Sequence, residues 1–449
     1  MTQVKTKLGI LEGMEKNGCR VFFGVPYAKP PVGPLRWHAP VALEPWEGIR
    51  SACCFPNRSM QDEHEDPFYG KEFYDEPQYQ TDISEDSLYL NIWAPKQGQK
   101  LPVAFWIHGG AFMGGFGHEK EFDGEAYCQR GVILVTVNYR LGPFGFLAHP
   151  WLSEESEREG SGRVSGNFGI LDQIAALQWV RENIEAFGGD PNRITVFGQS
   201  AGCMSVQTLI SSPLTWGMIS GAILQSGLGL NYDHTLAQAE AQGWEFSENA
   251  KVRSLDEMRS LSTRQVFDAA GPIIMKGFPK MELPYTPIID DYVLKMGYAD
   301  TIREDCIHTV PYIVGTTLND IATDPQAVAA GEKGKVYDGC TAFCETLRKN
   351  GREAPYRYYF TRQLPGDSAG AFHSSELWYM FGTLGRSWRP FTEGDYRLSA
   401  QMLDYWTNFM KTGDPNGPGL KKWNACQTDA DIHVFDIESS TPAKKERTL

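Results

Sequence analysis

The chain has 449 residues, of which 41% are hydrophobic, and carries a formal net charge of −14 at pH 7. This amount of apolar material can build the core of one large α/β unit or of two or three domains. An acidic surface repels phosphate groups, so nucleic acid and anionic membranes are not expected as partners, and a small neutral or cationic molecule is favoured.

The N-terminal segment MTQVKTKLGILEG lacks the apolar run of a signal peptide, and no run of about 18 apolar residues occurs in the sequence. We therefore expect no membrane association and a cytoplasmic location. The nine cysteines are scattered, apart from the neighbours Cys53 and Cys54 and the pair Cys340 and Cys344. Their odd number and spacing predict free thiols rather than a disulfide framework or a zinc site, and no metal or other cofactor is expected.

Six short apolar runs bounded by turn residues predict strands. Because both faces of these runs are apolar, we expect parallel strands buried in a sheet. The runs are LPVAFWIHGG (101–110), GVILVTVNYR (131–140), RITVFG (193–198), GAILQSG (221–227), VPYIVG (310–315) and IHVFD (432–436).

Between two of these runs, residues 169–193 place Ile170, Ile174, Leu177, Ile184 and Phe187 at helical spacing before a Gly-Gly-Asp-Pro stop. Alternating strands and helices predict an α/β fold with a mostly parallel central sheet and functional residues at the C-terminal ends of its strands. Residues 1–449 read as a single domain. Residues 40–85 and 232–285 are less strand-like, and we expect the second segment to be a helical insertion covering the active site.

The hexapeptide FGQSAG (197–202) places Ser200 between a predicted strand and a segment, AGCMSVQTLIS, that can begin a helix. This arrangement is typical of a nucleophile elbow, in which Gly198 and Gly202 permit a tight turn that exposes the serine hydroxyl. An ordinary N-cap serine is the alternative. The oxyanion of an acyl-transfer reaction also needs backbone donors, and Gly109, Gly110 and the N–H of Ala201 are the candidates; a merely flexible glycine loop is the alternative reading.

A serine nucleophile needs a base, and in this fold the order along the chain is nucleophile, acid, histidine. Four histidines follow Ser200: His234, His308, His373 and His433. His373 is favoured because it lies in a loop of small residues, whereas the other three lie in or near predicted strands or the insertion. The acid that orients the imidazole is expected to be Asp320, which follows a buried strand, with Asp324 as its competitor and Asp290 and Asp291 as further candidates.

The chain resembles the type B carboxylesterases, relatives of cholinesterases and of bacterial para-nitrobenzyl esterases with the α/β-hydrolase fold. The resemblance rests on ordered motifs that run through nearly the whole chain. They are FFGVPYAKPPVGPLRW (22–37), SEDSLYLNIWAP (84–95), WIHGGAF (106–112), NYRLGPFGFL (138–147), the segment 166–202, LQSG (224–227) and WTNFMKTGDPN (406–416).

The resemblance implies a catalytic triad of Ser200, His373 and Asp320, and an oxyanion hole formed by Gly109, Gly110 and Ala201. It also implies that Ser226 supports the acid. The chain departs from the family pattern where Asp320-Ile321 stands for the usual Glu-Gly and where Gln199 stands for the frequent Glu before the serine. Ser87 stands where secreted animal members often have a disulfide cysteine, which favours a reducing compartment and a bacterial source.

The expected activity is hydrolysis of a small-molecule carboxylic ester through an acyl-enzyme on Ser200. Five residues near the motifs are candidates for an apolar substrate pocket, with core packing as the alternative for each: Phe112, Met113, Trp378, Tyr379 and Phe381. Two other functions stay open. One is a catalytically silent cholinesterase-like binding protein, and the other is a hydrolase of the same fold that acts on lipids, thioesters or amides.

Overall fold

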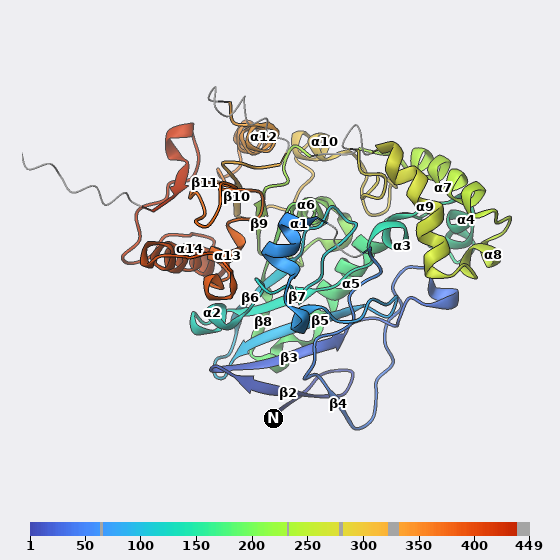
Figure 1. Ribbon diagram of the computed structural model, residues 1–449, viewed down its shortest axis with the longest axis horizontal. Helices are drawn as coiled ribbons and strands as arrows, with labels where there is room; N and C mark the ends of the chain where they lie inside the picture. Colours follow the sequence, from blue (N-terminus) through green and yellow to red (C-terminus); the bar gives the residue numbers. More distant parts are fainter. Residues whose placement is uncertain (63–65, 231–232, 278–281, 322–331, 438–449) are drawn as a thin grey trace, which may run out of the picture.

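A twelve-stranded sheet runs through the computed structural model, which describes residues 1–62, 66–230, 233–277, 282–321 and 332–437 (Figure 1). The strand order is β1-β2-β3-β5-β7-β6-β8-β9-β10-β11-β12, with β4 beside β2. The strands are β1 (Thr2–Lys5), β2 (Ile10–Lys16), β3 (Cys19–Pro26), β4 (Ile49–Ser51), β5 (Tyr89–Pro95), β6 (Leu101–Ile107), β7 (Ile133–Val137), β8 (Gly189–Gln199), β9 (Gly221–Gln225), β10 (Tyr312–Thr317), β11 (Tyr356–Phe360) and β12 (His433–Phe435).

The sheet is parallel from β7 through β12 and antiparallel from β1 to β7. Each of the six predicted strands is present, and the α/β-hydrolase fold class is confirmed. The antiparallel strands were not predicted. In β2, for example, exposed or half-buried residues alternate with buried Leu11 and with Gly13, because one face of this strand is partly open to solvent.

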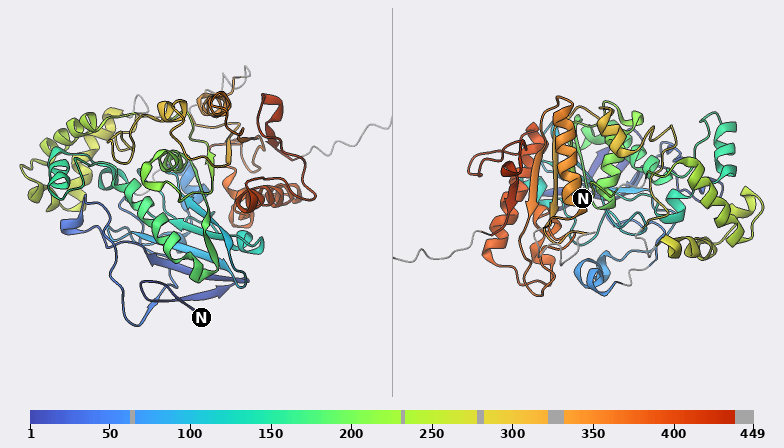
Figure 2. Two further views of the ribbon diagram at one scale, coloured as in Figure 1. Left: turned by 180° about the vertical axis from the view of Figure 1, so that it is seen from behind. Right: turned by 90° about the horizontal axis from the view of Figure 1, so that it is seen from above.

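Helices cover both faces of the sheet and fill its connections (Figure 2). The helix that follows the nucleophile motif begins at Ala201, as predicted. The helices are α1 (Pro67–Tyr69), α2 (Glu125–Gln129), α3 (Gly142–Phe146), α4 (Pro150–Arg158), α5 (Phe168–Asn183), α6 (Ala201–Ser211), α7 (Leu236–Ala250), α8 (Leu255–Arg259), α9 (Thr263–Gly277), α10 (Tyr298–Arg303), α12 (Lys335–Lys349), α13 (Leu377–Met380) and α14 (Glu393–Thr412), together with a π-helical turn, η2 (Gly70–Tyr74), and 3₁₀ turns at 33–35, 77–79, 184–187, 213–215, 384–386 and 429–431.

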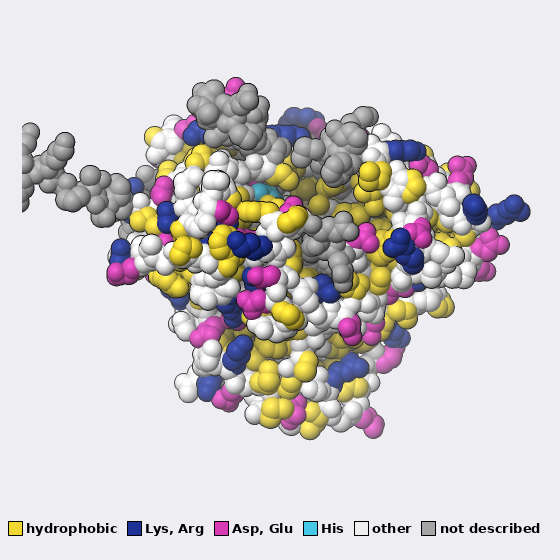
Figure 3. All heavy atoms as spheres, viewed as in Figure 1, with side chains coloured by type: hydrophobic (Ala, Val, Ile, Leu, Met, Phe, Trp, Pro, Cys, Tyr) yellow, Lys and Arg dark blue, Asp and Glu magenta, His cyan; other side chains and the backbone are white. Residues whose placement is uncertain are grey.

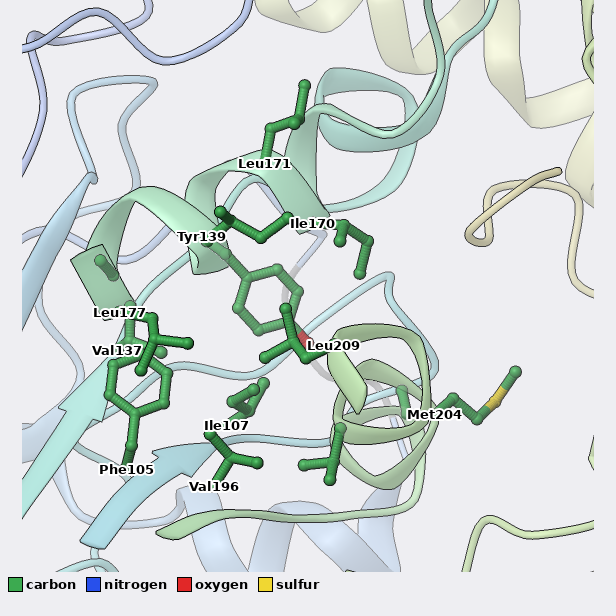
Figure 4. Close-up of a cluster of buried hydrophobic side chains, with 14 of the residues drawn as sticks. Phe105, Ile107, Val137, Tyr139, Ile170, Leu171, Leu177, Val196, Met204 and Leu209 are labelled. Carbon is green, nitrogen blue, oxygen red and sulfur yellow. The ribbon is translucent and has the colours of Figure 1, made fainter. Parts of the chain in front are cut away.

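A core of buried side chains lies between the sheet and helices α5 and α6 (Figure 4). Burial of each large apolar side chain contributes about 1.5–3 kcal/mol relative to exposure, so this layer fixes α6 on the sheet. Tyr139 crosses the layer and donates a hydrogen bond from its hydroxyl to the carbonyl of His108 at 3.0 Å. The cluster includes Phe105, Ile107, Val137, Val196, Leu171, Leu177, Met204 and Leu209.

The segment 232–285 is largely helical where it is described, in α7, α8 and α9, as the sequence predicts. Figures 1 and 2 show these helices gathered with α4 at one edge of the molecule, opposite α13 and α14. Among the described residues, none from this segment lines the cavity beside Ser200. The part of the insertion that the structure describes therefore lies beside the active-site region and not over it, which corrects the expected covering role.

Acidic and basic side chains are interspersed over the face drawn in Figure 3. Arg389 and Glu72 form a buried ion pair, and Arg389 also binds the more exposed Asp367, whereas pairs such as Lys29 with Glu44 are exposed. No helix in the described part of the chain is both long enough and apolar enough to cross a lipid bilayer.

Candidate active site

Ser200 occupies a strained turn between β8 and α6. Its φ of 59° and ψ of −125° lie in a region that a residue with a Cβ atom rarely adopts. The turn is held to the sheet because the N–H of Ser200 donates to the carbonyl of Gln225 in β9 at 2.9 Å. Its hydroxyl consequently stands at the C-terminal edge of the parallel strands.

The glycines on either side of Ser200 are required by close backbone contacts. A Cβ atom at Gly202 would collide with the carbonyl oxygen of Ile107, and a Cβ atom at Gly198 would lie against the backbone of Gly202. The turn therefore fits against the end of β6 only with glycine at both positions, as the elbow motif predicts.

Gly109 and Gly110 follow β6 and bring their backbone close to the serine. A Cβ atom at Gly109 would lie 3.2 Å from the Cβ of Ser200, and Gly110 has a φ of +99°. No described residue accepts a hydrogen bond from the N–H groups of Gly109, Gly110 or Ala201. Three backbone donors beside Ser200 are thus available to a ligand.

His373 lies beside Asp320 in a direct hydrogen bond, with Nδ1 2.6 Å from Oδ1 of the carboxyl. Both side chains are largely enclosed, with exposed fractions of 11% and 2%. A short hydrogen bond of this kind places the proton of the neutral imidazole on Nδ1 and leaves Nε2 as an acceptor.

Two loops that are distant in sequence carry this pair. Asp320 follows β10 and His373 follows β11, and the loops pair through a bridge between Asn319 and Phe372. The N–H of Asn319 donates to the carbonyl of Ala371, and the N–H of Ala371 donates to Oδ1 of Asn319, both at 3.0 Å. This exchange fixes the position of the imidazole relative to the carboxyl.

The Asp320 carboxyl accepts several hydrogen bonds besides that of His373. The N–H of Thr317 donates at 3.0 Å, the N–H of Ile321 at 2.8 Å, and the hydroxyl of Thr316 also donates. Burial alone would raise the pKa of Asp320, but the adjacent His373, together with the Thr316 and Ser226 hydroxyls, holds this pKa below its usual range. Asp320 is therefore an ionised carboxylate at neutral pH, and the supporting role of Ser226 stays a prediction.

Gln199 directs its side-chain amide toward the imidazole. Its Nε2 lies 3.1 Å from Nε2 of His373 and 3.3 Å from Nδ1. This neutral amide therefore lies next to Nε2, the nitrogen through which His373 would act as a base.

The competing histidines, and the acids Asp290 and Asp291, lie elsewhere. His308 is buried against Trp216 and His433 stacks on Trp423, and burial lowers the pKa of each to about 4. His234 precedes α7, where its carbonyl accepts a hydrogen bond from Ile289. Asp290 binds Asn167 and three backbone N–H groups of its own loop. Asp291 is exposed beside it, and Asp324 lies outside the described residues.

A cavity of about 430 Å³ opens beside Ser200 and His373. Of the five predicted pocket residues, Met113 lines it. The prediction is wrong for the other four, which are buried in packing contacts: Phe112 against Phe146, Trp378 against Phe73, Phe381 against Trp106, and Tyr379 through a hydrogen bond from its hydroxyl to Asp395.

Much of the wall comes instead from a segment that offered no sequence signal. Tyr69, Phe73 and Tyr74 reach the cavity from α1 and η2, and the hydroxyl of Tyr69 donates to the carbonyl of His373 at 3.2 Å. Glu119 and Glu121 also line it. Residues next to a motif in the sequence are only its backbone neighbours. These residues of the cavity wall are distant from Ser200 in the sequence, and the fold brings them to it.

Glu376 is a second carboxyl that sequence reasoning did not single out, although it stands three residues after His373. It is fully buried, and the hydroxyl of Tyr358 donates to its Oε1 at 3.3 Å. Burial, followed by the charge of Asp320, raises the pKa of Glu376 to about 7. A carboxyl that keeps its proton below about pH 7 thus lies behind the ionised Asp320.

Comparison with known proteins agrees with this geometry. Residues 1–336 and 339–448 match the sequence model of the carboxylesterase family. The chain is 34% identical to para-nitrobenzyl esterase of Bacillus subtilis (strain 168), over 99% of this chain and 98% of that one. It is 33% identical to fumonisin B1 esterase of Sphingopyxis macrogoltabida, over 96% and 85% of the two chains.

Solved structures of the same kind superimpose on it. A thermophilic para-nitrobenzyl esterase matches with a TM-score of 0.84 at 31% identity, covering 97% of this chain and 96% of that one. A carboxylesterase of Geobacillus stearothermophilus matches with a TM-score of 0.79, also at 31% identity and with the same coverage. Among the described residues, no group of three or more His, Cys, Asp or Glu side chains could hold a metal ion. The serine turn, the family match and the relatives together favour the esterase over a silent binding protein, and the chain is a member of the carboxylesterase family, a carboxylic ester hydrolase of the α/β-hydrolase fold.

Proposed function

We propose that Ser200, His373 and Asp320 form the catalytic triad of this esterase, with Gly109, Gly110 and Ala201 as the oxyanion hole. The observation that carries the proposal is the 2.6 Å hydrogen bond from His373 Nδ1 to Asp320, because His373 lines the same cavity as Ser200. Ionised Asp320 fixes the imidazole tautomer and stabilises its cation, so Nε2 can take a proton.

The reaction proceeds in two acyl transfers. His373 Nε2 takes the hydroxyl proton of Ser200 while Oγ bonds to the ester carbon, and the carbonyl electron pair moves onto oxygen. The three backbone N–H groups stabilise this oxyanion. The bond to the alcohol oxygen then breaks, and His373 returns the proton to the leaving alcohol. Water repeats the sequence on the acyl-enzyme, which releases the acid and restores the Ser200 hydroxyl.

Substitution of Ser200 by Ala tests the nucleophile. Ser200→Ala is expected to lower kcat for a p-nitrophenyl ester by several orders of magnitude and to abolish labelling by a fluorescent phosphonate, because the reacting oxygen is absent. Its unfolding curve should match that of the parent chain. Ser161→Ala, at an exposed turn, is the matched control and should keep full activity. Retention of a tenth of the parent activity by Ser200→Ala would overturn the assignment.

The same proposal takes a small-molecule ester as the partner of the chain, and not nucleic acid or a membrane. The cavity volume of about 430 Å³ supports a ligand of that size. A panel of acyl lengths that includes a thioester and an amide distinguishes ester hydrolysis from the other chemistries open to this fold. Faster turnover of the amide or thioester than of the matched ester would contradict it.

We further propose that the protein works in a bacterial cytoplasm. All nine cysteines are unpaired thiols, which supports a reducing compartment. Fractionation of the source cells should recover the esterase activity in the cytoplasmic fraction, with nine alkylatable thiols after denaturation. Recovery of a disulfide-bonded form from another compartment would overturn this proposal.

A further inference from the structure

Two glutamates, Glu119 and Glu121, lie in the wall of the cavity beside Ser200. They belong to the loop that connects β6 to α2, whose first residues include Gly109 and Gly110. Their exposed fractions are 5% and 1%. Acidic side chains are rarely buried to this extent without a partner that neutralises them, so these two carboxyls are expected to have a binding partner.

The loop folds back so that Glu119 lies close to the backbone beside Ser200. A Cβ atom at Gly115 would lie 3.1 Å from Oε1 of Glu119 and 2.8 Å from the carbonyl oxygen of Gly109. Gly109 is in turn the residue that approaches Ser200. The carboxyl pair therefore belongs to the same cavity region as the proposed reacting groups.

The two carboxyls differ in their hydrogen bonds. Oε1 of Glu119 accepts from the N–H of Phe116 at 2.9 Å, and its Oε2 accepts from the hydroxyl of Tyr74 at 3.1 Å. Oε2 of Glu121 is buried, and no described residue donates a hydrogen bond to it. A buried acceptor without a hydrogen bond destabilises the folded chain, and a ligand that donates a hydrogen bond to it removes this cost.

Among the described residues, no Lys or Arg forms an ion pair with Glu119 or Glu121. Asp62 and Asp66 also line the cavity, whereas no Lys or Arg is among its described lining residues. The nearest cation in the sequence, Lys120, is buried and directs its ammonium group to Asp75. Tyr69, Phe73, Tyr74 and Phe122 complete this part of the wall with aromatic surface.

In the empty cavity a proton supplies the missing positive charge. Burial raises the pKa of Glu119 to about 7, and burial followed by the charge of Glu119 raises that of Glu121 well above its usual range. At Glu119 a hydrogen bond shared with Glu121, the Phe116 N–H and the Tyr74 hydroxyl oppose the rise in pKa. At Glu121 Lys120 opposes it. Tyr139, on the far side of Glu119, is buried and neutral. The pair thus holds one proton near neutral pH.

We propose that Glu119 and Glu121 form a subsite for a protonated amine carried by the ester substrate, with Glu121 Oε2 accepting one of its N–H groups. This inference deepens the proposed function and rests on Ser200 as the nucleophile. The ammonium replaces the shared proton, which leaves to solvent, and its N–H donors bind the carboxyl oxygens. A quaternary ammonium has no N–H group and satisfies neither carboxyl, so the subsite distinguishes it from an amine.

The test compares three ethyl esters that differ only at the end of the acyl chain, over a series of chain lengths. One ends in an amine, such as ethyl 6-aminohexanoate, the second in a methyl group, such as ethyl heptanoate, and the third in a trimethylammonium group. At about pH 8, where an aliphatic amine is still protonated, kcat/KM for the amine ester should exceed that for the other two by about tenfold or more at the best chain length.

Glu121→Gln should remove most of this preference, measured as the ratio of kcat/KM for the amine ester to that for the methyl ester, because the amide is isosteric but uncharged. Glu119→Gln is the second variant and should weaken the preference in the same direction. Glu154→Gln, on the exposed face of α4 and remote from the cavity, is the matched control and should change nothing. In the parent chain the preference should grow from about pH 6 to pH 8 as Glu119, whose pKa is raised to about 7, loses its proton.

Equal kcat/KM for amine and methyl esters at every chain length, or an undiminished preference in Glu121→Gln, would overturn the subsite. So would equal rates for amine and trimethylammonium esters, which would assign recognition to the aromatic wall. Failure of the proposed function looks different: Ser200→Ala would then hydrolyse the methyl ester as fast as the parent chain.

Discussion

At the residue scale, Asp320, the proposed acid of the triad, is held in place by contacts that the sequence alone does not reveal. Asp320 meets His373 directly, and its carboxyl is held by two backbone N–H groups and by Thr316. The short Asp320 side chain reaches the imidazole because the hydrogen bonds between Asn319 and Ala371 bring the two loops together.

Asp320→Asn should therefore lower kcat strongly while KM changes little, since the carboxylate orients the base and need not touch the substrate. The loss should be roughly two orders of magnitude smaller than that of Ser200→Ala. Steady-state kinetics under identical conditions, with Asp324→Asn as the comparison, checks this expectation. If Asp324→Asn is inactive and Asp320→Asn is nearly normal, the acid of the triad is Asp324 and not Asp320.

Gln199 is a second residue whose replacement has a defined consequence. Its amide lies 3.1 Å from Nε2 of His373. Gln199→Glu would place a carboxylate there, which favours the imidazolium form, so the acid limb of the pH–rate profile should move to higher pH. Gln199→Ala, which removes the amide without adding charge, should not move the limb upward. An unchanged limb in Gln199→Glu would show that the amide does not face the base during catalysis.

At the scale of elements, α13 connects the site to the sheet through Glu376. This residue stands directly before α13 and contacts Tyr358 of β11 and Gln225 of β9. Its pKa is raised to about 7 in the folded chain, chiefly by burial, whereas an unfolded glutamate titrates near 4.5. The folded state therefore keeps a proton that the unfolded state releases.

Between about pH 4.5 and 7 this group should lower the free energy of unfolding as pH rises, by up to about 3 kcal/mol in all. Glu376→Gln cannot ionise, so its free energy of unfolding should fall less over that range than that of the parent chain. Urea unfolding at several pH values measures the difference, with Glu154→Gln expected to follow the parent curve. Parallel curves for the parent chain and Glu376→Gln would contradict the raised pKa.

The elements also show what sequence reasoning could supply. The strands β6 to β10 are apolar on both faces, so residues such as Val103 and Val196 predict them, and the Gly198–Gly202 spacing predicts the elbow. The pocket could not be predicted in the same way. Trp378 and Phe112 are near the motifs in sequence but point into the core, and the residues that replace them follow no local pattern.

At the scale of the whole molecule, Glu72 ties the cavity wall to the C-terminal region. It accepts hydrogen bonds from Trp378 at 2.8 Å, from Trp388 at 3.0 Å and from Arg389 at 3.0 Å, and it is almost fully buried. More than three hundred residues of chain separate it from these partners. The wall formed by α1 and η2 is therefore stabilised by contacts that span the protein.

Glu72→Ala should lower the free energy of unfolding by about 3–5 kcal/mol, because it leaves the buried Arg389 with one fewer carboxylate. Glu44→Ala, which breaks the exposed pair with Lys29, should cost less than about 1 kcal/mol. Thermal and urea unfolding of both variants gives the comparison. Equal losses would mean that the buried ion pair does not stabilise the fold.

The pairing of the two loops at Asn319 and Ala371 also determines where the chain can change in length. Extra residues after half-buried Asn350, at the exposed Gly351 between α12 and β11, leave both loop ends in place, since loop closure becomes costlier only slowly with length. A single inserted residue between Phe360 and Ala371 instead shifts the imidazole out of register with its carboxylate. Tolerance of insertions and deletions in this half of the protein is thus set by the two hydrogen bonds between Asn319 and Ala371.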